Sequence, residues 1–241
     1  MPAHLIRALV TGANNGIGRE VARQLAADGH TVHVGSRDAA RGREAVRDIG
    51  GDSHLQILDV TDADSIAAAA AEIDSLDVLI NNAGINLDSL TAPDASVDTF
   101  RRTYETNIFG VLAVTNAFLP ALRRSAHPRI VNVSSGTGSI AWSTGPNPQF
   151  PYQTGGSSAA YRSSKTALNA LTVHYAQALA AQGFKVNALA PGLRATNLTP
   201  GAASRGGDPA EAAAGVARLA LLPDDGPTGG FFSWDGSPVP W

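Results

Sequence analysis

Short runs of apolar, often β-branched residues alternate along this chain with longer stretches in which apolar residues recur every three or four positions. The short runs are typical of buried strands, and the longer spacing is typical of helices with one apolar face. One such helix is predicted through Phe100, Tyr104, Ile108 and Val111. Seven strands are predicted, at Leu5–Val10, Thr31–Val34, Leu55–Leu58, Val78–Ile80, Ile130–Val133, Lys185–Leu189 and Phe231–Phe232.

The alternation of predicted strands and helices indicates the fold class. A helix between two strands carries the chain back to the starting edge of the sheet, so the strands it joins run parallel. We therefore predict an α/β fold with a Rossmann-type doubly wound sheet of about seven parallel strands and helices on both faces. No repeat or linker-like composition divides the chain, so residues 1–241 are expected to form a single domain. Ligands of such sheets bind at the carboxyl ends of the strands.

Two long segments interrupt the alternation. Residues 136–160 and 191–208 are rich in Gly, Pro, Ser and Thr and show no regular period. Irregular segments of this length are uncommon in a compact α/β domain unless they cover a site. We predict that both cover a substrate, and that Trp142, Phe150 and Tyr152 form an apolar wall beside it. Burial that only anchors the segment is an equally good interpretation of these aromatic residues.

Composition and charge narrow the class of protein. The chain has 241 residues, 44% of them hydrophobic, with 18 basic and 21 acidic residues and a net charge of −3. The basic residues are scattered, which is not the pattern of a surface that binds nucleic acid or an anionic membrane. There is no cysteine, and the six histidines lack metal-site spacing, so no metal is expected. No membrane span or secretion signal is visible, and we expect a cytoplasmic protein.

A glycine-rich turn follows the first predicted strand. Thr11–Gly18 reads TGANNGIG and runs into a predicted helix at Arg19–Asp28. Glycines between a strand and a helix let backbone N–H groups approach a pyrophosphate, which the helix dipole also attracts. After the second strand, Ser36 and Arg37 stand where such folds contact the adenosine ribose. Arginine suits a 2′-phosphate, so NADPH is predicted in preference to NADH; a solvated surface arginine is the alternative.

A second motif lies after the first irregular segment. Tyr161 and Lys165 are four residues apart, which places both on one face of a helix. A nearby ammonium group lowers the pKa of a phenol toward working pH, and such a phenol can give and take a proton in catalysis. We therefore predict that Tyr161 is the catalytic acid and base. The alternative is that Tyr161 packs in the core while Lys165 is solvated.

The motifs, in their order along the chain, resemble those of the short-chain dehydrogenases/reductases. The resemblance rests on Thr11–Gly18, on NNAG at Asn81–Gly84, on Ser134–Ser135 and on the Tyr161–Lys165 motif. These are features of the TGxxxGxG/YxxxK subgroup, and they span essentially the whole chain. Further family features stand at Asp59–Val60, Asn107, Pro191–Gly192 and Thr196.

The resemblance implies a role for each matching residue. Tyr161 would protonate a carbonyl oxygen, Lys165 would lower the pKa of the phenol and hold the nicotinamide ribose, and Ser135 would hydrogen-bond the carbonyl. Ser134 is the alternative to Ser135. Asn107 would hold a water molecule that links Lys165 to solvent. Residues implied to bind the coenzyme, besides Tyr161 and Lys165, are Gly12, Asn14, Asn15, Gly16, Ile17, Gly18, Ser36, Arg37, Asp59, Val60, Asn81, Ala83, Gly84, Pro191, Gly192, Leu193 and Thr196.

The separation of two catalytic residues indicates a smaller group within the family. Ser135 and Tyr161 are 26 residues apart, well beyond the separation in many members. The extra sequence resembles that of carbonyl-reductase-like members, in which it can cover the helical face that others use to form tetramers. The resemblance therefore favours a monomer, while a dimer or a tetramer stays open.

The expected activity is NADPH-dependent, reversible reduction of a small ketone or aldehyde to an alcohol. One alternative is a catalytically idle NADP-binding regulatory module, but a pure binding protein has no need of an activated phenol. Another is a reductase of acyl substrates tethered to a carrier protein. That activity needs a basic docking patch, for which the candidates are Arg101, Arg102, Arg123 and Arg124.

Overall fold

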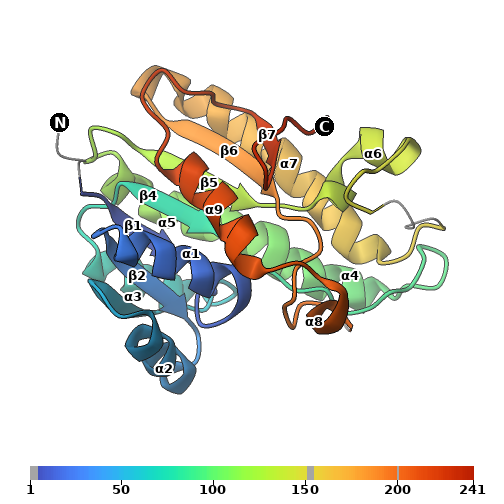
Figure 1. Cartoon of the computed structure of the whole chain (residues 1–241), viewed down its shortest axis with the longest axis horizontal. Helices are drawn as coiled ribbons and strands as arrows, with labels where there is room; N and C mark the ends of the chain where they lie inside the picture. The colour runs from blue at the N-terminus through green and yellow to red at the C-terminus, as the bar shows by residue number, and fades with distance from the viewer. Residues whose placement is uncertain (1–4, 151–154, 200) are drawn as a thin grey trace.

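The fold is that of a computed structural model, which describes residues 5–150, 155–199 and 201–241. Within these residues, seven parallel strands form one sheet in the order β3-β2-β1-β4-β5-β6-β7 (Figure 1), which confirms the predicted fold class. The sequence order reverses between β1 and β4, and doubly wound sheets bind ligands at such a reversal. The strands are β1 (Arg7–Val10), β2 (Thr31–Ser36), β3 (Ser53–Ile57), β4 (Val78–Asn81), β5 (Arg129–Val133), β6 (Lys185–Ala190) and β7 (Phe231–Ser233).

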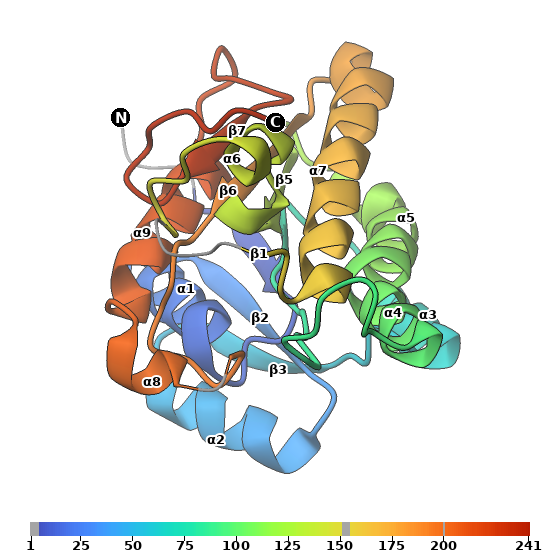
Figure 2. The same cartoon turned by 90° about the vertical axis from the view of Figure 1, so that its right-hand side faces the viewer.

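Helices cover both faces of the sheet, with α1, α2 and α9 on one side and α3, α5 and α7 on the other (Figure 2). No helix among the described residues is both long enough and apolar enough to cross a lipid bilayer. The helices are α1 (Gly16–Ala27), α2 (Ala39–Ile49), α3 (Ala63–Glu72), α4 (Val97–Tyr104), α5 (Gly110–Leu122), α6 (Ile140–Thr144), α7 (Ala159–Leu179), α8 (Ala202–Arg205) and α9 (Pro209–Ala220), with shorter helical turns η1 (Glu105–Phe109), η2 (Gly136–Gly138) and η3 (Ala180–Gln182).

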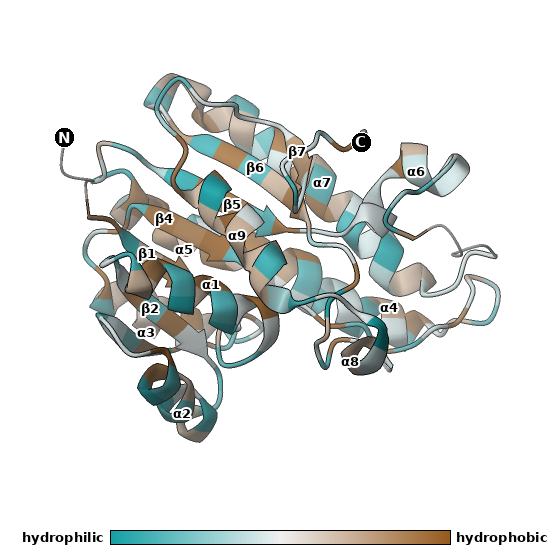
Figure 3. Cartoon of the chain, in the orientation of Figure 1, coloured by the Kyte–Doolittle hydropathy of each residue, from teal (hydrophilic) through white to brown (hydrophobic). Residues whose placement is uncertain are grey.

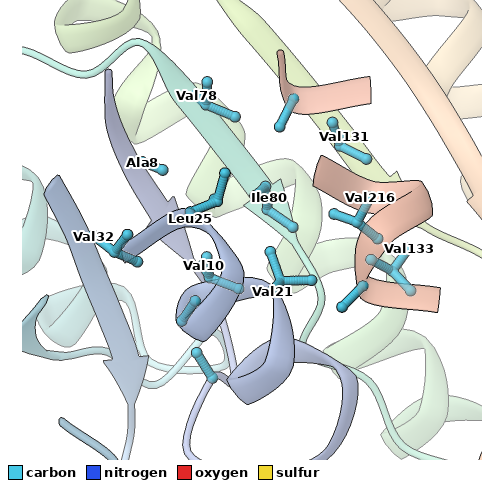
Figure 4. Close-up of a cluster of buried hydrophobic side chains, with 14 of the residues drawn as sticks. Ala8, Val10, Val21, Leu25, Val32, Val78, Ile80, Val131, Val133 and Val216 are labelled. Atoms are coloured by element: carbon cyan, nitrogen blue, oxygen red, sulfur yellow. The ribbon is translucent and has the colours of Figure 1, made fainter. Parts of the chain in front are cut away.

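The core has two layers because successive side chains of a strand point to opposite faces of the sheet. Val10 of β1 packs with Leu25 of α1 and Val216 of α9 (Figure 4). Its neighbour Leu9 packs on the other face, in a cluster that includes Phe118 of α5. Both faces of the sheet are thus apolar, and β4 is brown along most of its length in Figure 3. This two-sided burial holds the carboxyl ends of the strands in a rigid row.

Strand ends differ from the predicted ones by a few residues. The pattern predicts a third strand that begins at Leu55, but β3 begins at Ser53. Ser53 and His54 pair with Val32 and His33 of β2. Backbone pairing, which is independent of side-chain polarity, therefore sets the start of this strand.

Candidate active site

A cavity of about 460 Å³ opens at the carboxyl ends of the strands. Its wall comes from the segments that follow β1, β2, β3, β4 and β6, from the end of β5 and from α7. The fold thus brings together residues that are far apart in the sequence. The predicted coenzyme residues that line the cavity are Gly12, Asn14, Asn15, Gly16, Ile17, Ser36, Arg37, Asp59, Val60, Ala83, Gly84, Tyr161, Lys165, Pro191 and Thr196.

Four other predicted coenzyme residues, Gly18, Asn81, Gly192 and Leu193, are not part of this wall. The side chain of Asn81 points into the interior, where its Nδ2 donates to Thr115 Oγ1 and Asn132 Oδ1. Wall residues outside the set predicted to bind the coenzyme are Asp38, Arg41, Leu58, Thr61, Asn82, Ile85, Asn86, Leu87, Thr106, Val133, Ser134, Asn197 and Leu198.

The backbone of the glycine-rich turn can be approached closely by a ligand. Gly12 and Gly16 both have positive φ, +62° and +55°, in the region where residues with side chains are strained. A Cβ on Gly16 would come within 3.3 Å of the methyl group of Thr196. No side chain caps the N-terminus of α1, so its first N–H groups are available to an anion. This turn therefore fits a dinucleotide pyrophosphate.

Asn82 joins the glycine-rich turn to the end of β4. Its backbone N–H donates to Thr11 Oγ1 over 3.0 Å, and its Nδ2 donates to the carbonyl oxygen of Thr11 over 2.9 Å. The second asparagine of the NNAG motif thus fixes the position of the turn beside the cavity. Its neighbour Asn81 instead contacts the interior because side chains alternate along a strand.

The adenosine end of the cavity carries two arginines and one acid. Asp38 caps α2, because its Oδ1 accepts from the N–H groups of Ala40 and Arg41 at 2.9 and 3.0 Å. These hydrogen bonds, that of Arg41 first, lower the pKa of the Asp38 carboxyl. The guanidinium of Arg41 lies 3.7 Å from the same carboxylate. Arg37 is exposed and lines the cavity. The acid is therefore engaged with the start of α2, while Arg37 faces the site.

Tyr161 and Lys165 lie on one face of α7 and reach the cavity together, as their spacing predicts. The ammonium nitrogen of Lys165 is 5.7 Å from the centre of the Tyr161 ring. It donates a hydrogen bond of 2.8 Å to the carbonyl oxygen of Val133, the last residue of β5. Lys165 is buried rather than solvated, so the alternative interpretation of the motif is wrong on this point.

The predicted direction of the Tyr161 pKa is wrong for this structure. Burial raises the pKa of Tyr161 to about 12, and a hydrogen bond with the side chain of Ser135 lowers it only in part. Burial also lowers the pKa of Lys165 to about 8. Both shifts have the same cause, since a low-dielectric surrounding disfavours whichever form is charged. At neutral pH the phenol is therefore protonated.

The two adjacent serines have different surroundings. The hydroxyl of Ser135 hydrogen-bonds to the Tyr161 side chain and lies 2.9 Å from Thr137 Oγ1. Ser134 lines part of the cavity, but its hydroxyl donates to Asn169 Oδ1 over 2.6 Å. Ser135 is not among the cavity-lining residues, but its hydroxyl, unlike that of Ser134, contacts the Tyr161 side chain. The geometry therefore favours Ser135 as the partner of Tyr161.

Asn107 lies in η1, a π-helical turn between α4 and α5, where the pattern predicts one regular helix. It is fully buried, and its Nδ2 donates to Ser164 Oγ over 2.9 Å. A Cβ on Gly84 would lie 3.3 Å from Asn107 Oδ1 and 3.4 Å from Lys165 Nζ. Asn107 and Lys165 therefore meet across Gly84. Such π turns occur frequently at functional sites.

The predicted aromatic wall lies beside this cavity and not in it. Trp142 and Phe150 line a neighbouring hollow with Arg162 of α7, and Trp142 also packs against a cluster that contains Phe231. Tyr152 lies outside the described residues. Contact of Trp142 and Phe150 with a substrate stays a prediction.

The described residues thus form a doubly wound nucleotide-binding fold with a half-buried phenol, a buried serine and a buried lysine at or beside its cavity. A family model for short chain dehydrogenases matches residues 7–205. Salutaridine reductase from Papaver bracteatum is 32% identical over 93% of each chain. A crystal structure of NADPH-bound carbonyl reductase from chicken fatty liver is 30% identical, with a TM-score of 0.84 over 98% of this chain and 99% of that one. A 3-oxoacyl-[acyl-carrier protein] reductase from Brucella melitensis, with bound NAD, is 26% identical with a TM-score of 0.81, over 96% of this chain and 90% of that one.

The chain therefore belongs to the short-chain dehydrogenase/reductase family and is an oxidoreductase of that family. The cavity at the carboxyl ends of the strands is the candidate site for the nicotinamide coenzyme that this family binds.

Proposed function

We propose that this enzyme reduces a small ketone or aldehyde to an alcohol with NADPH, in a reversible reaction. The observation that carries the proposal is the joint presence of the Tyr161 phenol and the Lys165 ammonium at the cavity, with Ser135 hydrogen-bonded to the phenol. A binding module without catalysis has no physical need for a phenol with a buried ammonium group beside it. The cytoplasmic location and the monomeric state stay predictions.

The protein side of the reaction is proton transfer and orientation. Bound nicotinamide supplies the hydride, which goes to the carbonyl carbon. Tyr161 Oη gives its proton to the carbonyl oxygen, and Ser135 donates a hydrogen bond to the same oxygen, where negative charge develops. Because its pKa is about 12, Tyr161 is loaded with a proton at neutral pH, which favours the reductive direction. Lys165 is positioned to hold the ribose and to stabilise the phenolate that forms.

After the reaction, Tyr161 must regain its proton, and Asn107 lies near Lys165 on the route to solvent that we propose. Asn107 Oδ1 accepts from the backbone N–H of Ile85 and its Nδ2 donates to the carbonyl oxygen of the same residue, at 2.9 and 3.0 Å. These contacts fix the side chain where it meets Lys165 across Gly84. We propose that Asn107 orders a water molecule there, through which Tyr161 and Lys165 regain a proton from solvent.

The choice of NADPH rests on charge at the adenosine end. A free carboxylate would repel a 2′-phosphate, but that of Asp38 is bound to the start of α2 and lies near Arg41. Arg37 has neither an ion pair nor a hydrogen bond to any other described residue, so its guanidinium is available to the phosphate. The similar carbonyl reductase binds NADPH, whereas the similar oxoacyl reductase binds NAD.

A carrier-tethered substrate is less well supported. Of the four arginines proposed for docking, Arg102 lies 3.9 Å from Asp98. Arg123 Nε donates to Gln182 Oε1, and Arg124 donates to the carbonyl oxygen of Asp74. Three of the four are thus engaged within the chain.

The proposed function is tested by measuring initial rates of NADPH and NADH oxidation with a panel of aldehydes, ketones and quinones. We expect turnover that prefers NADPH and falls about a thousandfold or more in Tyr161→Phe, because the phenol supplies general acid catalysis. The variant should bind NADPH as tightly as the wild type. Full activity of Tyr161→Phe would overturn the assigned role, and a preference for NADH would overturn the assignment of Arg37. NADPH binding without turnover of any carbonyl would favour the binding-module alternative.

A further inference from the structure

Arg194 is a buried arginine that has no role in the proposed reaction. It is 6% exposed and does not line the cavity. It nevertheless stands between Pro191 and Thr196, which do line it. Burial of an ionised side chain is costly unless charged and polar partners compensate for lost water. Charged and polar partners are therefore expected around the Arg194 guanidinium.

The guanidinium of Arg194 has partners in three separate segments. Its Nε donates to the carbonyl oxygen of Pro191 over 2.6 Å. Its Nη1 pairs with the carboxylate of Glu211, in the first turn of α9. The group also stacks on the ring of Trp234, 4.4 Å from the ring centre. A planar group with several donors is suited to such simultaneous contacts.

The backbone of Arg194 closes the base of segment 191–208. Arg194 forms an isolated parallel bridge with Gly207, in which Gly207 accepts from Ala195 N–H over 2.9 Å and donates to the carbonyl oxygen of Leu193 over 3.0 Å. A Cβ on Gly206 would lie only 2.3 Å from the backbone carbonyl carbon of Arg194. Glycine is therefore needed at position 206 for this close approach of the two backbone segments. The segment that carries α8 (Figure 1) is thus pinned at both ends.

Both cavity-lining neighbours are tied directly to Arg194. Pro191 accepts from its side chain, and Thr196 N–H donates to its backbone carbonyl over 2.8 Å. The Thr196 methyl in turn faces Gly16 of the glycine-rich turn. Pro191 follows β6, which lies across the sheet from β2, whose end carries Arg37 at the adenosine end of the cavity. We propose that Arg194 is a positioning residue, which fixes Pro191 and Thr196 and thereby shapes the side of the coenzyme site opposite the adenosine end, where the nicotinamide would lie. The inference rests on the proposed NADPH site.

The test separates the two halves of the coenzyme. Dissociation constants for NADPH and for adenosine 2′,5′-bisphosphate, which lacks the nicotinamide half, are measured by calorimetry for the wild type, Arg194→Met and Arg129→Met. Arg129 is the matched control, because it is also a buried arginine, paired with Asp224 over 2.6 Å, and it does not line the cavity. We expect Arg194→Met to weaken NADPH binding about tenfold or more, since misplaced contacts lose binding energy, and to leave binding of the bisphosphate within about twofold. The control should change neither constant.

Three outcomes would overturn the inference. They are unchanged NADPH binding by folded Arg194→Met, an equal loss for both ligands, and the same selective loss in Arg129→Met. Trp234→Leu, which removes only the stacking partner, is measured as well and should show the same selective loss, so the inference can be tested even where Arg194→Met does not fold. A wild-type protein that binds neither ligand would instead contradict the proposed coenzyme site itself.

Discussion

At the scale of single residues, the site holds two groups whose ionised forms are both disfavoured by burial. The pKa of Tyr161 rises to about 12 and that of Lys165 falls to about 8. The protein therefore keeps a charge in an unfavourable place, and Lys165 at neutral pH is the group that bears it. An energetic cost of this kind is expected where a side chain is selected for chemistry and not for stability.

The energetic cost of burying the Lys165 ammonium predicts that the difference in stability between the wild type and Lys165→Met depends on pH. Below about pH 8 the folded protein carries the buried ammonium at a cost, whereas the lysine of the unfolded chain stays protonated up to about pH 10.5. Between these values the unfolded state binds more protons, so the wild type gains stability as the pH rises. We expect its free energy of unfolding to rise relative to that of Lys165→Met by about 3 kcal/mol across this range. Urea unfolding at pH 7.5 and pH 10.5 measures the change, and an equal difference at both would contradict it.

At the scale of elements, the starts of helices divide into two kinds. A side chain caps α2, α3, α4 and α9, through Asp38, Asp62, Ser96 and Asp208. No side chain caps α1, α5, α7 or α8. A cap would add stability to a helix end, and its absence at α1 leaves the first backbone donors of that helix available beside the glycine-rich turn. At α7 the first N–H group, that of Ala159, instead donates to the carbonyl oxygen of Leu90 over 3.1 Å.

The cap of α2 predicts opposite effects on stability and affinity. Asp38→Ala removes both cap and charge, whereas Asp38→Asn keeps a capping oxygen and removes the charge. We expect Asp38→Ala to lower the melting temperature by about 2–4 °C and Asp38→Asn to leave it within about 1 °C. Both should tighten NADPH binding by about two- to threefold, because each variant removes a solvent-screened negative charge from the adenosine end of the cavity. Scanning calorimetry and fluorescence titration measure these effects, and weaker NADPH binding by Asp38→Asn would contradict the expectation.

At the level of the whole molecule, segment 238–241 joins β7 to the segment that follows Ser135. The ring of Trp241 stacks on Phe231 of β7, with ring centres 5.3 Å apart. The carbonyl oxygens of Pro240 and Trp241 accept from Ser139 Oγ and Ala141 N–H, at 2.6 and 3.1 Å. Distant parts of the chain therefore hold α6 in place.

This connection predicts that Trp241→Ala loosens α6 without harm to the coenzyme site. We expect the melting temperature to fall by about 2–6 °C, from loss of the stacked ring, while the dissociation constant for NADPH stays the same. Leu221→Ala is a matched control, since Leu221 is 42% exposed and Trp241 is 41% exposed. The control should lower the melting temperature by less than about 1 °C. An equal fall in both variants would show that the stacking contributes nothing specific.

The features that depend on local order along the chain can be predicted from the amino-acid sequence. Alternating strands and helices specified the parallel sheet, and four-residue spacing placed Tyr161 and Lys165 on one face of a helix, because period and helix geometry are local properties. Most residues of the TGANNGIG turn line the candidate cavity, and coenzyme binding by them stays a prediction.

Other features depend on neighbours that are distant in the sequence, and these features are visible only in the folded structure. The raised pKa of Tyr161 comes from burial by several elements, and no spacing between two residues reports the surrounding dielectric. The contacts of Arg194 with Trp234 and Glu211 also form only in the folded chain. The same is true of the π-helical turn that places Asn107 near Gly84 and Lys165. Contacts across the sheet carry no period in the sequence, so they emerge only when the chain has folded.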